Sequence, residues 1–483
     1  MRVLHLASEL APFAQSGGLA DVVAGLPAAQ AEVHDLDAAV MIPLYRGVAG
    51  TLAAAGHALD AGFPVALQVG PHRFDARIRR AELGRVRHGF VDCPALYDRD
   101  GLYGPGGAAE FADNHLRFAA LGAAAVAGGD ALAGGPVDVL HLHDWQAGAA
   151  AVYARLDGRR KLAIVATIHN LAYRGIYPKA ALDELGLPWS MFTSACLEFY
   201  DQISLLKGGL ALADAVTTVS PSYAREILTP ERGEALDGFL RWNVKRLVGI
   251  ANGIDTRAWD PATDAALPAR FTASDLSGKA ICRAALLAEL GLPPADEAEP
   301  VIGVIARMTG QKGLDLVADL VPELSRIGAR LIVLGSGEPA LERRFAWLAE
   351  TFREHVAVRI GFDGGLARRI YAGSDLFAMP SRFEPCGLGQ LYAMRYGTIP
   401  VVHAVGGLRD TVLDPGDAEL ANGRGTGVRF VSDTPAGLVG AIERAAALHR
   451  DPAVRQRLRR AAMARDSSWL AAAQQYVQVY RNL

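Results

Sequence analysis

Two cations that directly follow a predicted strand are the residues of this sequence best placed to do chemistry. Arg307 and Lys312 lie five residues apart, after the apolar run at residues 301–306. Cations at the end of a buried strand can neutralise a diphosphate leaving group, whose negative charge grows as its bond to a sugar breaks. For one cation alone, solvated surface charge is the better interpretation. The pattern Arg-x-x-x-Gln-Lys-Gly, which contains both cations, favours a functional role for the pair.

A second candidate site is the loop that contains the carboxylate of Glu384. A strand is predicted over residues 375–379 and a helix over residues 388–396. The N–H groups in the first turn of a helix lack internal partners, so they favour phosphate or hydroxyl oxygens. We therefore expect this loop to hold a sugar nucleotide, and an ordinary β-loop-α connection is the alternative. The backbone N–H groups would come from Cys386, Gly387 and Leu388.

The glycine turn Ser16-Gly17-Gly18 follows the strand predicted over residues 3–7. Glycine lets backbone N–H groups approach a phosphate or a glucose closely. By itself, a Gly-Gly turn is more often an ordinary turn. Its position directly after the first strand favours ligand binding. Asp21, in the first turn of the following helix, can pair with a ligand hydroxyl or simply favour the helix dipole.

Three other polar residues follow strands or form turns in the first predicted domain. His169 follows the strand predicted over residues 164–168, and the alternative to a site residue is a histidine that caps a turn. Asp144 follows the strand predicted over residues 137–142. It is a candidate for acceptor contact or acid–base chemistry, or else a cap of the next helix. Asn252 lies in Ala-Asn-Gly-Ile-Asp, where a turn is the alternative.

Short apolar runs alternate with helical patterns, which predicts an α/β fold of parallel sheets covered by helices on both faces. Because 483 residues exceed what one core usually supports, two domains are expected. The rhythm of strands stops between residues 255 and 300, where we place the hinge. We predict domains over residues 1–255 and 256–462 and a closing helical segment over residues 463–483. The apolar runs lie at residues 3–7, 137–142, 164–168, 215–219, 301–306, 331–334, 356–360, 376–379 and 399–403.

Bulk properties exclude several classes of partner. The formal charge of −3, with acidic and basic residues interspersed, gives no basic face for nucleic acid and no polybasic patch for a membrane. No uninterrupted apolar run reaches about 18 residues, and the first residues lead directly into a strand rather than a signal peptide. We therefore expect a soluble cytoplasmic protein. No metal site is expected, since the cysteines lack zinc spacing; they are Cys93, Cys196, Cys282 and Cys386.

The segment at residues 380–397, which contains Phe-Glu-Pro-Cys-Gly-Leu-Gly, resembles the retaining two-domain GT-B glycosyltransferases. Within them it is similar to bacterial glycogen synthase and plant starch synthase. The resemblance extends over nearly the whole chain, because eight other segments of that family occur in order. They lie at residues 15–21, 141–145, 167–172, 206–209, 219–226, 251–255, 307–313 and 406–410.

The resemblance implies a GT-B fold, in which two Rossmann-like, doubly wound parallel-sheet domains face a deep cleft and the final helix crosses back to the first domain. It implies catalytic roles for His169, Asp144, Arg307, Lys312 and Glu384. In the family, the histidine lies beside the reacting sugar and stabilises positive charge at the anomeric carbon, and Glu384 would position donor hydroxyls or supply counter-charge. The implied donor-binding residues are Gln15, Ser16, Gly17, Gly18, Asp21, Asn252, Cys386, Gly387, Leu388, Gly406 and Gly407.

One departure from the family pattern concerns the donor site. The usual Lys-Thr-Gly-Gly-Leu is Gln15-Ser16-Gly-Gly-Leu here, so a cation near the expected pyrophosphate is absent. Losing one such contact would cost about 1.5–3 kcal/mol. Lys207 and Tyr103 also match family positions.

The implied activity is transfer of α-glucosyl from ADP-glucose to the non-reducing 4-hydroxyl of an α-1,4-glucan, in glycogen biosynthesis and without a cofactor. No second carboxylate obviously pairs with Glu384, which agrees with front-face substitution and retention of configuration. One alternative is a related transferase that uses UDP-glucose or a small sugar acceptor. The other is a catalytically weak glucan-binding homologue, for which Gln15 is the support.

Overall fold

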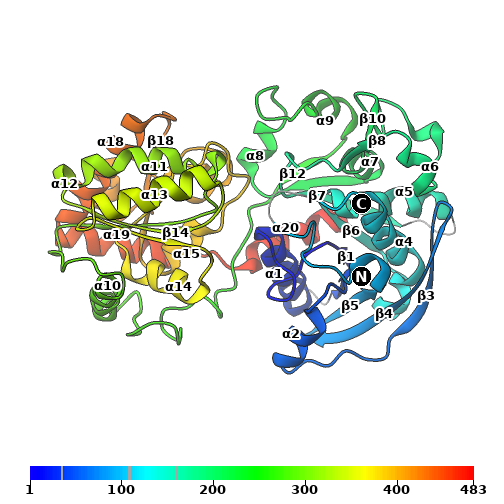
Figure 1. Ribbon diagram of the computed structural model, residues 1–483, viewed down its shortest axis with the longest axis horizontal. Helices are drawn as coiled ribbons and strands as arrows, with labels where there is room; N and C mark the ends of the chain where they lie inside the picture. Colours follow the sequence, from blue (N-terminus) through cyan, green and yellow to red (C-terminus); the bar gives the residue numbers. More distant parts are fainter. Residues whose placement is uncertain (34–35, 107–109, 159–161) are drawn as a thin grey trace. The chain divides into compact units, whose positions relative to one another are not determined.

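The computed structural model describes residues 1–33, 36–106, 110–158 and 162–483 and divides into two compact units (Figure 1). Unit 1 consists of Met1–Gly253 and Trp469–Leu483, and unit 2 of Ile254–Ser468. The chain therefore passes from unit 1 to unit 2 at residues 253–254 and returns at residues 468–469. The boundaries expected from the sequence were after residues 255 and 462. Within unit 2, these two crossing points lie side by side, because Ile254 and Ser468 form a parallel bridge.

Unit 1 is built on a nine-stranded sheet with the order β12-β11-β7-β6-β1-β2-β5-β4-β3. The strands from β12 to β5 in this order run parallel, whereas β4 and β3 continue the sheet antiparallel. Their bounds are β1 Arg2–Leu6, β2 Asp37–Pro43, β3 Phe63–Val69, β4 His72–Leu83, β5 Val86–Asp92, β6 Val139–His143, β7 Ala163–Ile168, β11 Ala215–Thr218 and β12 Leu247–Gly249. A small antiparallel sheet contains β8 Ile176–Pro178, β9 Glu198–Phe199 and β10 Gln202–Ser204.

Helices cover both faces of this sheet. On one face α1 and α20 pack together, with the indole of Trp469 against Gly25, where a Cβ atom would lie only 2.0 Å from the indole nitrogen. In Figure 1 these are the blue and red helices that lie side by side. Among the described residues one helix, α4, is long and apolar enough to cross a membrane, but 67% of its apolar window is buried inside the protein. It is a core helix on the other face of the sheet, against β2, β3 and β5.

The helices of unit 1 are α1 Gly18–Val33, α2 Val48–Ala54, α3 Pro94–Tyr97, α4 Asn114–Ala133, α5 Gly148–Asp157, α6 Ala181–Leu185, α7 Leu205–Leu212, α8 Pro221–Glu226, α9 Asp237–Asn243 and α20 Trp469–Arg481. Two 3₁₀ turns, η1 and η2, cover Trp145–Ala147 and Trp189–Met191.

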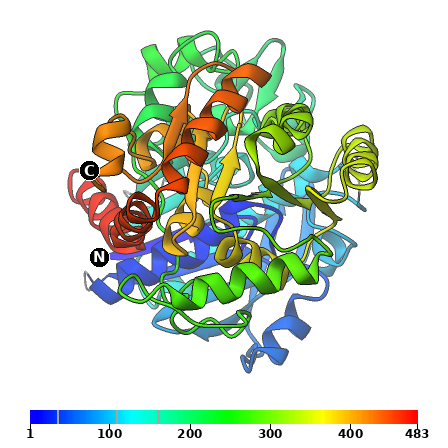
Figure 2. The same ribbon diagram turned by 90° about the vertical axis from the view of Figure 1, so that its left-hand side faces the viewer.

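Unit 2 has a six-stranded parallel sheet with the order β15-β14-β13-β16-β17-β18. Its central strands are apolar on both faces, and alternate residues enter different cores: Ile302 belongs to one cluster and Val301 to the other. Helices accordingly flank the sheet on both sides (Figure 2). The strands are β13 Val301–Ile305, β14 Arg330–Gly335, β15 Val356–Ile360, β16 Leu376–Met379, β17 Ile399–His403 and β18 Val428–Phe430.

The helices of unit 2 are α10 Ser277–Glu289, α11 Leu314–Leu320, α12 Leu324–Ile327, α13 Pro339–Thr351, α14 Gly364–Gly373, α15 Gly389–Arg395, α16 Gly406–Thr411, α17 Asp417–Ala421, α18 Pro435–Arg450 and α19 Pro452–Ala464. The 3₁₀ turns η3 and η4 cover Gly310–Lys312 and Val321–Glu323.

The two parallel sheets each have a point at which the strand order reverses. In unit 1 the chain adds β2 on one side of β1 and β6 on the other, and in unit 2 it adds β14 and β16 on opposite sides of β13. Loops at such reversal points separate and leave room for ligands at the carboxyl ends of the strands. The predicted site residues follow β1, β6, β7 and β12 in unit 1 and β13, β16 and β17 in unit 2. The topology therefore brings them to the ligand-binding edge of each sheet.

Candidate active site

In unit 1, the loop after β1 is folded around the carboxylate of Glu9. This side chain, only 3% exposed, accepts hydrogen bonds from the backbone N–H groups of Ser16 and Gly17 at 2.8 and 3.2 Å. It also accepts bonds from the Ser16 hydroxyl at 2.6 Å and the Tyr103 hydroxyl at 2.7 Å. Two N–H groups predicted to meet a phosphate are thus already bonded to a carboxylate. Sequence reasoning missed Glu9, although its place just after a buried strand was a usable signal.

Gln15 and Asp21 form a hydrogen-bonded pair beside this loop. The Gln15 side-chain amide donates to Asp21 Oδ2 at 3.1 Å. Burial and, second to it, the nearby charge of Glu9 raise the pKa of Asp21 to about 6. The residue that replaces the family lysine therefore lies against a carboxyl group, so a lysine at this position would have an anion to pair with.

Asp144 fixes the loop that carries His169. Its Oδ1 accepts hydrogen bonds from the backbone N–H groups of His169 and Asn170 at 2.7 and 3.4 Å. It makes no side-chain cap to η1, the next helical turn. Asp144 has a φ of 56°, a conformation that costs energy in a non-glycine residue and is concentrated at functional sites. Burial raises its pKa to about 7.

The imidazole of His169 is neutral and hydrogen-bonded through one nitrogen. Its Nε2 lies 2.9 Å from Nδ1 of His143, and burial lowers the pKa of His169 to about 3. Within the described residues, Nδ1 of His169 has no hydrogen-bond partner. That nitrogen is available to a ligand.

Two other predicted positions of unit 1 have different surroundings. The side-chain oxygen of Asn252 is buried and has no hydrogen-bond partner among the described residues, which is the condition expected of a group that awaits a ligand. Lys207 instead donates to the main-chain oxygen of Glu198 and lies 5.2 Å from the ring centre of Phe239. Lys207 is therefore engaged in structural contacts.

In unit 2, the structure brings Lys312 and Glu384 into direct contact. Lys312 Nζ lies 2.6 Å from Glu384 Oε2, and the Ser381 hydroxyl donates to the same oxygen at 3.0 Å. The two charged side chains are 19% and 8% exposed. Arg307 is exposed and has no ion pair among the described residues. One cation is therefore partly neutralised by the carboxylate, and the other is free to meet an anion.

The glycines after β16 and β17 let two loops pack closely. A Cβ atom on Gly406 would lie 2.0 Å from the main-chain oxygen of Glu384, and one on Gly407 would lie 2.3 Å from that of Cys386. The N–H of Gly407 donates to main-chain oxygens of Glu384 and Pro385 at 3.1 and 3.2 Å. This N–H group, predicted to contact the donor, is therefore bonded within the protein. The helix expected over residues 388–396 is observed as α15, Gly389–Arg395.

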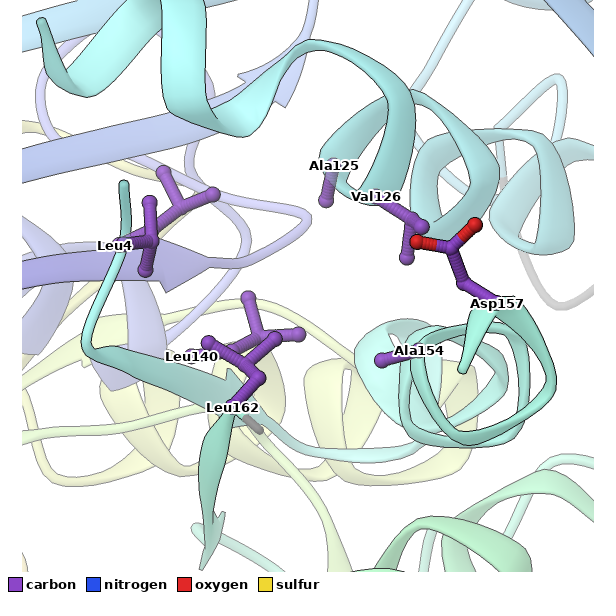
Figure 3. Close-up of a pocket in the computed structure, with 8 residues that line it drawn as sticks. Leu4, Ala125, Val126, Leu140, Ala154, Asp157 and Leu162 are labelled. Carbon is purple, nitrogen blue, oxygen red and sulfur yellow. The ribbon is translucent and has the colours of Figure 1, made fainter. Parts of the chain in front are cut away.

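The cavity drawn in Figure 3 is separate from these residues. It has a volume of about 10 Å³ and lies between Leu4, Leu140 and Val126, with the carboxylate of Asp157 at one side. A space of this size holds at most one water molecule. It is a packing defect on the α4 face of the sheet.

Buried histidines predict how stability depends on pH. In unit 1, burial lowers the pKa of His5 and His88 to about 4 and of His169 to about 3, and it lowers the pKa values of His141 and His143 strongly. The unfolded chain binds protons near pH 6.5 and the folded chain does not, so stability falls as the pH drops through this range, by about 2 kcal/mol per histidine at pH 5.

The raised pKa values of Asp21 and Asp144 act in the opposite direction, because acid relieves the cost of burying their charge. Five histidines outweigh two carboxyl groups, so the melting temperature should fall steadily between about pH 7 and about pH 5 in differential scanning calorimetry. A melting temperature that is constant or rises over this range would contradict the buried neutral histidines.

Comparisons with known proteins agree with this geometry. The pattern of the starch synthase catalytic domain matches residues 2–242, and that of glycosyl transferases group 1 matches residues 299–447. A glycogen synthase of Anaeromyxobacter dehalogenans is 48% identical, covering 100% of this chain and 99% of its own. A glycogen synthase of Myxococcus xanthus is 44% identical with the same coverage.

Solved structures give the same result. The catalytic domain of starch synthase IV from Arabidopsis thaliana, bound to ADP and acarbose, superposes with a TM-score of 0.89 at 32% identity and covers 99% of this chain and 98% of that one. Sucrose-phosphate synthase from Thermosynechococcus elongatus, at 19% identity and a TM-score of 0.56 over 100% of this chain and 98% of that one, shares the fold. The chain belongs to the glycogen synthase and starch synthase family of GT-B glycosyltransferases.

Proposed function

We propose that the protein transfers α-glucosyl from ADP-glucose to the non-reducing 4-hydroxyl of an α-1,4-glucan, with retention of configuration. Full-length similarity to glycogen synthases supports the reaction, and similarity to a starch synthase bound to ADP supports the choice of nucleotide. The observation that carries the proposal is the contact of Lys312 with Glu384 at the carboxyl ends of β13 and β16, in the same loop as Arg307, which has no ion pair among the described residues.

In this reaction each of the candidate site residues has a separate role. Arg307 and Lys312 neutralise the diphosphate as it leaves, a task that we assign to these side chains rather than to a metal ion. Glu384 holds Lys312 in place and accepts a donor hydroxyl. The acceptor hydroxyl attacks on the side from which the diphosphate departs, and a phosphate oxygen takes its proton. A neutral His169 can orient glucose near the anomeric carbon without adding a positive charge there.

We assign the acceptor polymer to a groove of about 420 Å³ in unit 1. Trp242 and Tyr200, which are 86% and 72% exposed, line it with aromatic faces suited to stacking on sugar rings. Arg174, in the loop that follows His169, donates to the main-chain oxygen of Glu234 and lies over the Phe199 ring. Arg174 thus connects the loop that carries the candidate catalytic histidine with Phe199, which lines the groove.

Strained backbone supports a functional role for this groove. Tyr200 and Ala235, both lining it, have φ values of 50° and 61°. Such conformations persist in non-glycine residues only where the surroundings impose them, and they concentrate at functional sites.

Replacing Trp242 by alanine should raise the KM for glycogen up to about tenfold, the value of one stacking contact. The KM for a short maltooligosaccharide that does not span the groove should change less. Trp347→Ala is the matched control, because Trp347 is also exposed, at 58%, but lies on α13 of unit 2. Equal effects of the two substitutions on glycogen would argue against the groove.

The decisive test of function is incorporation of labelled glucose into glycogen from ADP-glucose and, in parallel, from UDP-glucose. Transfer that prefers ADP-glucose and is lost in Glu384→Ala would establish the activity. Preference for UDP-glucose would correct the donor. Absence of transfer from both donors, in a protein that still binds glycogen, would instead favour a glucan-binding homologue.

Gln15→Lys tests the departure from the family pattern. The new ammonium would lie beside Asp21, which now accepts from the Gln15 amide. If the site lacks a cation, the KM for ADP-glucose should fall by about tenfold, as expected for one charged hydrogen bond. Gln15→Met, which has similar length and no charge, is the control. An unchanged KM would show that another cation already meets the pyrophosphate.

The compartment follows from the cysteines. None of the four cysteines forms a disulfide with another described residue. Free thiols fit a reducing environment, so we propose a cytoplasmic location.

A further inference from the structure

A buried chain of hydrogen bonds connects the last helix of the protein to His169. His5 on β1 and His141 on β6 are direct partners in the parallel pairing of these strands, and His143 lies two residues further on β6. Side chains of alternate strand residues share a face, so all three rings point to the face covered by α1 and α20. That face also receives Gln30 of α1 and Tyr480 of α20.

The distances along this chain are short throughout. The Gln30 amide nitrogen donates to the Tyr480 hydroxyl at 3.0 Å, and Gln30 Oε1 lies 2.9 Å from His5 Nε2. His5 Nδ1 lies 3.0 Å from His143 Nε2. His143 Nδ1 then lies 2.9 Å from His169 Nε2. Four links therefore join Tyr480 to the candidate catalytic histidine.

The direction of each hydrogen bond follows from its neighbour. Because Gln30 presents its oxygen to His5, His5 must carry its proton on Nε2 and accept on Nδ1. His143 must then donate from Nε2 and accept on Nδ1. His169 consequently donates from Nε2, and its Nδ1 keeps a bare lone pair. These steps require neutral rings, and burial lowers the pKa of each of the three histidines.

Tyr480 determines the orientation of the Gln30 side-chain amide, with its nitrogen toward Tyr480 and its oxygen toward His5. Its hydroxyl accepts from Gln30 and has one proton, which it donates to His141 Nδ1 at 2.7 Å. His141 then donates from Nε2 to the Thr167 hydroxyl at 2.6 Å. Without the Tyr480 oxygen, the amide nitrogen of Gln30 would lose its acceptor, and the amide could turn over. A turned amide would reverse every bond along the chain.

A metal ion is the competing interpretation of this cluster. Nitrogens of His5, His141 and His143 lie within 4.8 Å of one another, which is close enough for three ligands. Each ring nitrogen of the three, however, already has a hydrogen-bond partner. Metal binding would break several of these bonds in a fully buried space, so the geometry favours the hydrogen-bond chain.

We propose that Tyr480 and Gln30 are positioning residues that fix His169 in the tautomer with its proton on Nε2 and an unprotonated Nδ1. The inference rests on the proposed role of His169 in glucosyl transfer. A bare Nδ1 accepts a hydrogen bond from a sugar hydroxyl and presents electron density, not an N–H group, to the positive charge that develops at the anomeric carbon. The wrong tautomer of a catalytic histidine is known to cost large factors in rate.

The test uses the full chain labelled with ¹⁵N-histidine, in which protonated and bare imidazole nitrogens have distinct chemical shifts. The wild-type protein should show His169, assigned by its loss in His169→Gln, with a bare Nδ1. In Tyr480→Phe this pattern should change to a mixture of tautomers, and kcat should fall about tenfold with the KM for ADP-glucose changed less than twofold. Gln30→Glu keeps an oxygen facing His5, so it should keep the wild-type pattern.

The possible results separate the two proposals. If His169→Gln transfers glucose normally, the assigned role of His169 is wrong. If His169→Gln is inactive but Tyr480→Phe keeps the wild-type shifts, the positioning role of Tyr480 is wrong. Gln30→Leu serves where Tyr480→Phe fails to fold, since it removes the amide oxygen that directs the proton of His5. A shift of these resonances on addition of Zn²⁺ at stoichiometric concentration would favour the metal site instead.

Discussion

Replacing Lys312 by alanine is expected to lower kcat for glucosyl transfer by about 10²–10³-fold, the usual effect of removing one preorganised charge from a transition state. The substitution removes a cation from the leaving diphosphate and also leaves Glu384, which is 8% exposed, without its partner at 2.6 Å. Both effects oppose the reaction, because the unpaired carboxylate would repel the growing negative charge. The measurement is steady-state transfer to glycogen at saturating ADP-glucose.

A double substitution separates these two effects. Lys312→Ala with Glu384→Gln removes the buried charge, so the double variant should regain the stability that Lys312→Ala loses. Its kcat should stay low, because no cation has been restored. A double variant with near wild-type kcat would show that Lys312 serves only to neutralise Glu384.

The role of Arg307, the exposed cation, can be tested against a control substitution of another exposed arginine in the same unit. Arg307→Ala should lower kcat with little change in melting temperature, since Arg307 has no ion pair to lose among the described residues. Arg343→Ala removes another exposed arginine of unit 2, on α13, and should leave kcat unchanged. Similar kinetics for the two variants would remove Arg307 from the active site.

The sequence predicted the strands best where both faces are buried. The strands expected at residues 376–379 and 399–403 are observed with the same bounds as the buried strands β16 and β17. The strand expected at residues 356–360 is also observed, as β15, although its last two residues are exposed. Continuous apolar runs mark such strands because no solvent-facing residue interrupts them. The antiparallel strands β3 and β4 were not predicted. Their residues alternate between exposed and buried, and arginines occupy several exposed positions of β4, so the apolar signal is diluted.

Within the candidate site, motifs predicted which residues meet but not always how. Lys312 and Glu384 were expected in the same site from separate motifs, and the structure places their charges in contact. Gly407 was expected to offer its N–H to a ligand, but that group is bonded to the main chain of the neighbouring loop. A glycine such as Gly407 indicates that another group comes close to the backbone there. The sequence does not show whether that group is a ligand or a second loop of the protein.

The histidine chain could not be predicted from local patterns. His5 and His141 are 136 residues apart, and they become neighbours only through the pairing of β1 with β6. The same strands also bring their alternate residues to the face where α20 returns from the far end of the chain. Registers of parallel strands depend on long-range packing, which single motifs do not encode.

Replacing Glu9 is expected to have the second large effect, on the loop at residues 15–18. Its carboxylate accepts bonds from the N–H groups of Ser16 and Gly17 and from two hydroxyls. Each bond to a charged group contributes about 1.5–3 kcal/mol, and removal leaves buried donors without acceptors. Glu9→Ala should therefore lower the free energy of unfolding of unit 1 by about 3 kcal/mol or more. It should also raise the KM for ADP-glucose at least tenfold, because the loop no longer holds its shape.

Glu9→Gln decides whether the charge or the shape of this side chain matters. The amide can keep its oxygen toward the N–H groups of Ser16 and Gly17 and turn its NH₂ group toward the hydroxyls of Ser16 and Tyr103, which can accept, so the bonds can persist without the charge. An intermediate loss of stability with a raised KM is expected if the loop positions the donor. Tyr103→Phe removes one of the two hydroxyl bonds and leaves both N–H bonds, so its KM should stay close to wild type. If Glu9→Gln binds ADP-glucose as well as the wild type does, the charge is not needed, and if Glu9→Ala also does, the loop after β1 does not position the donor.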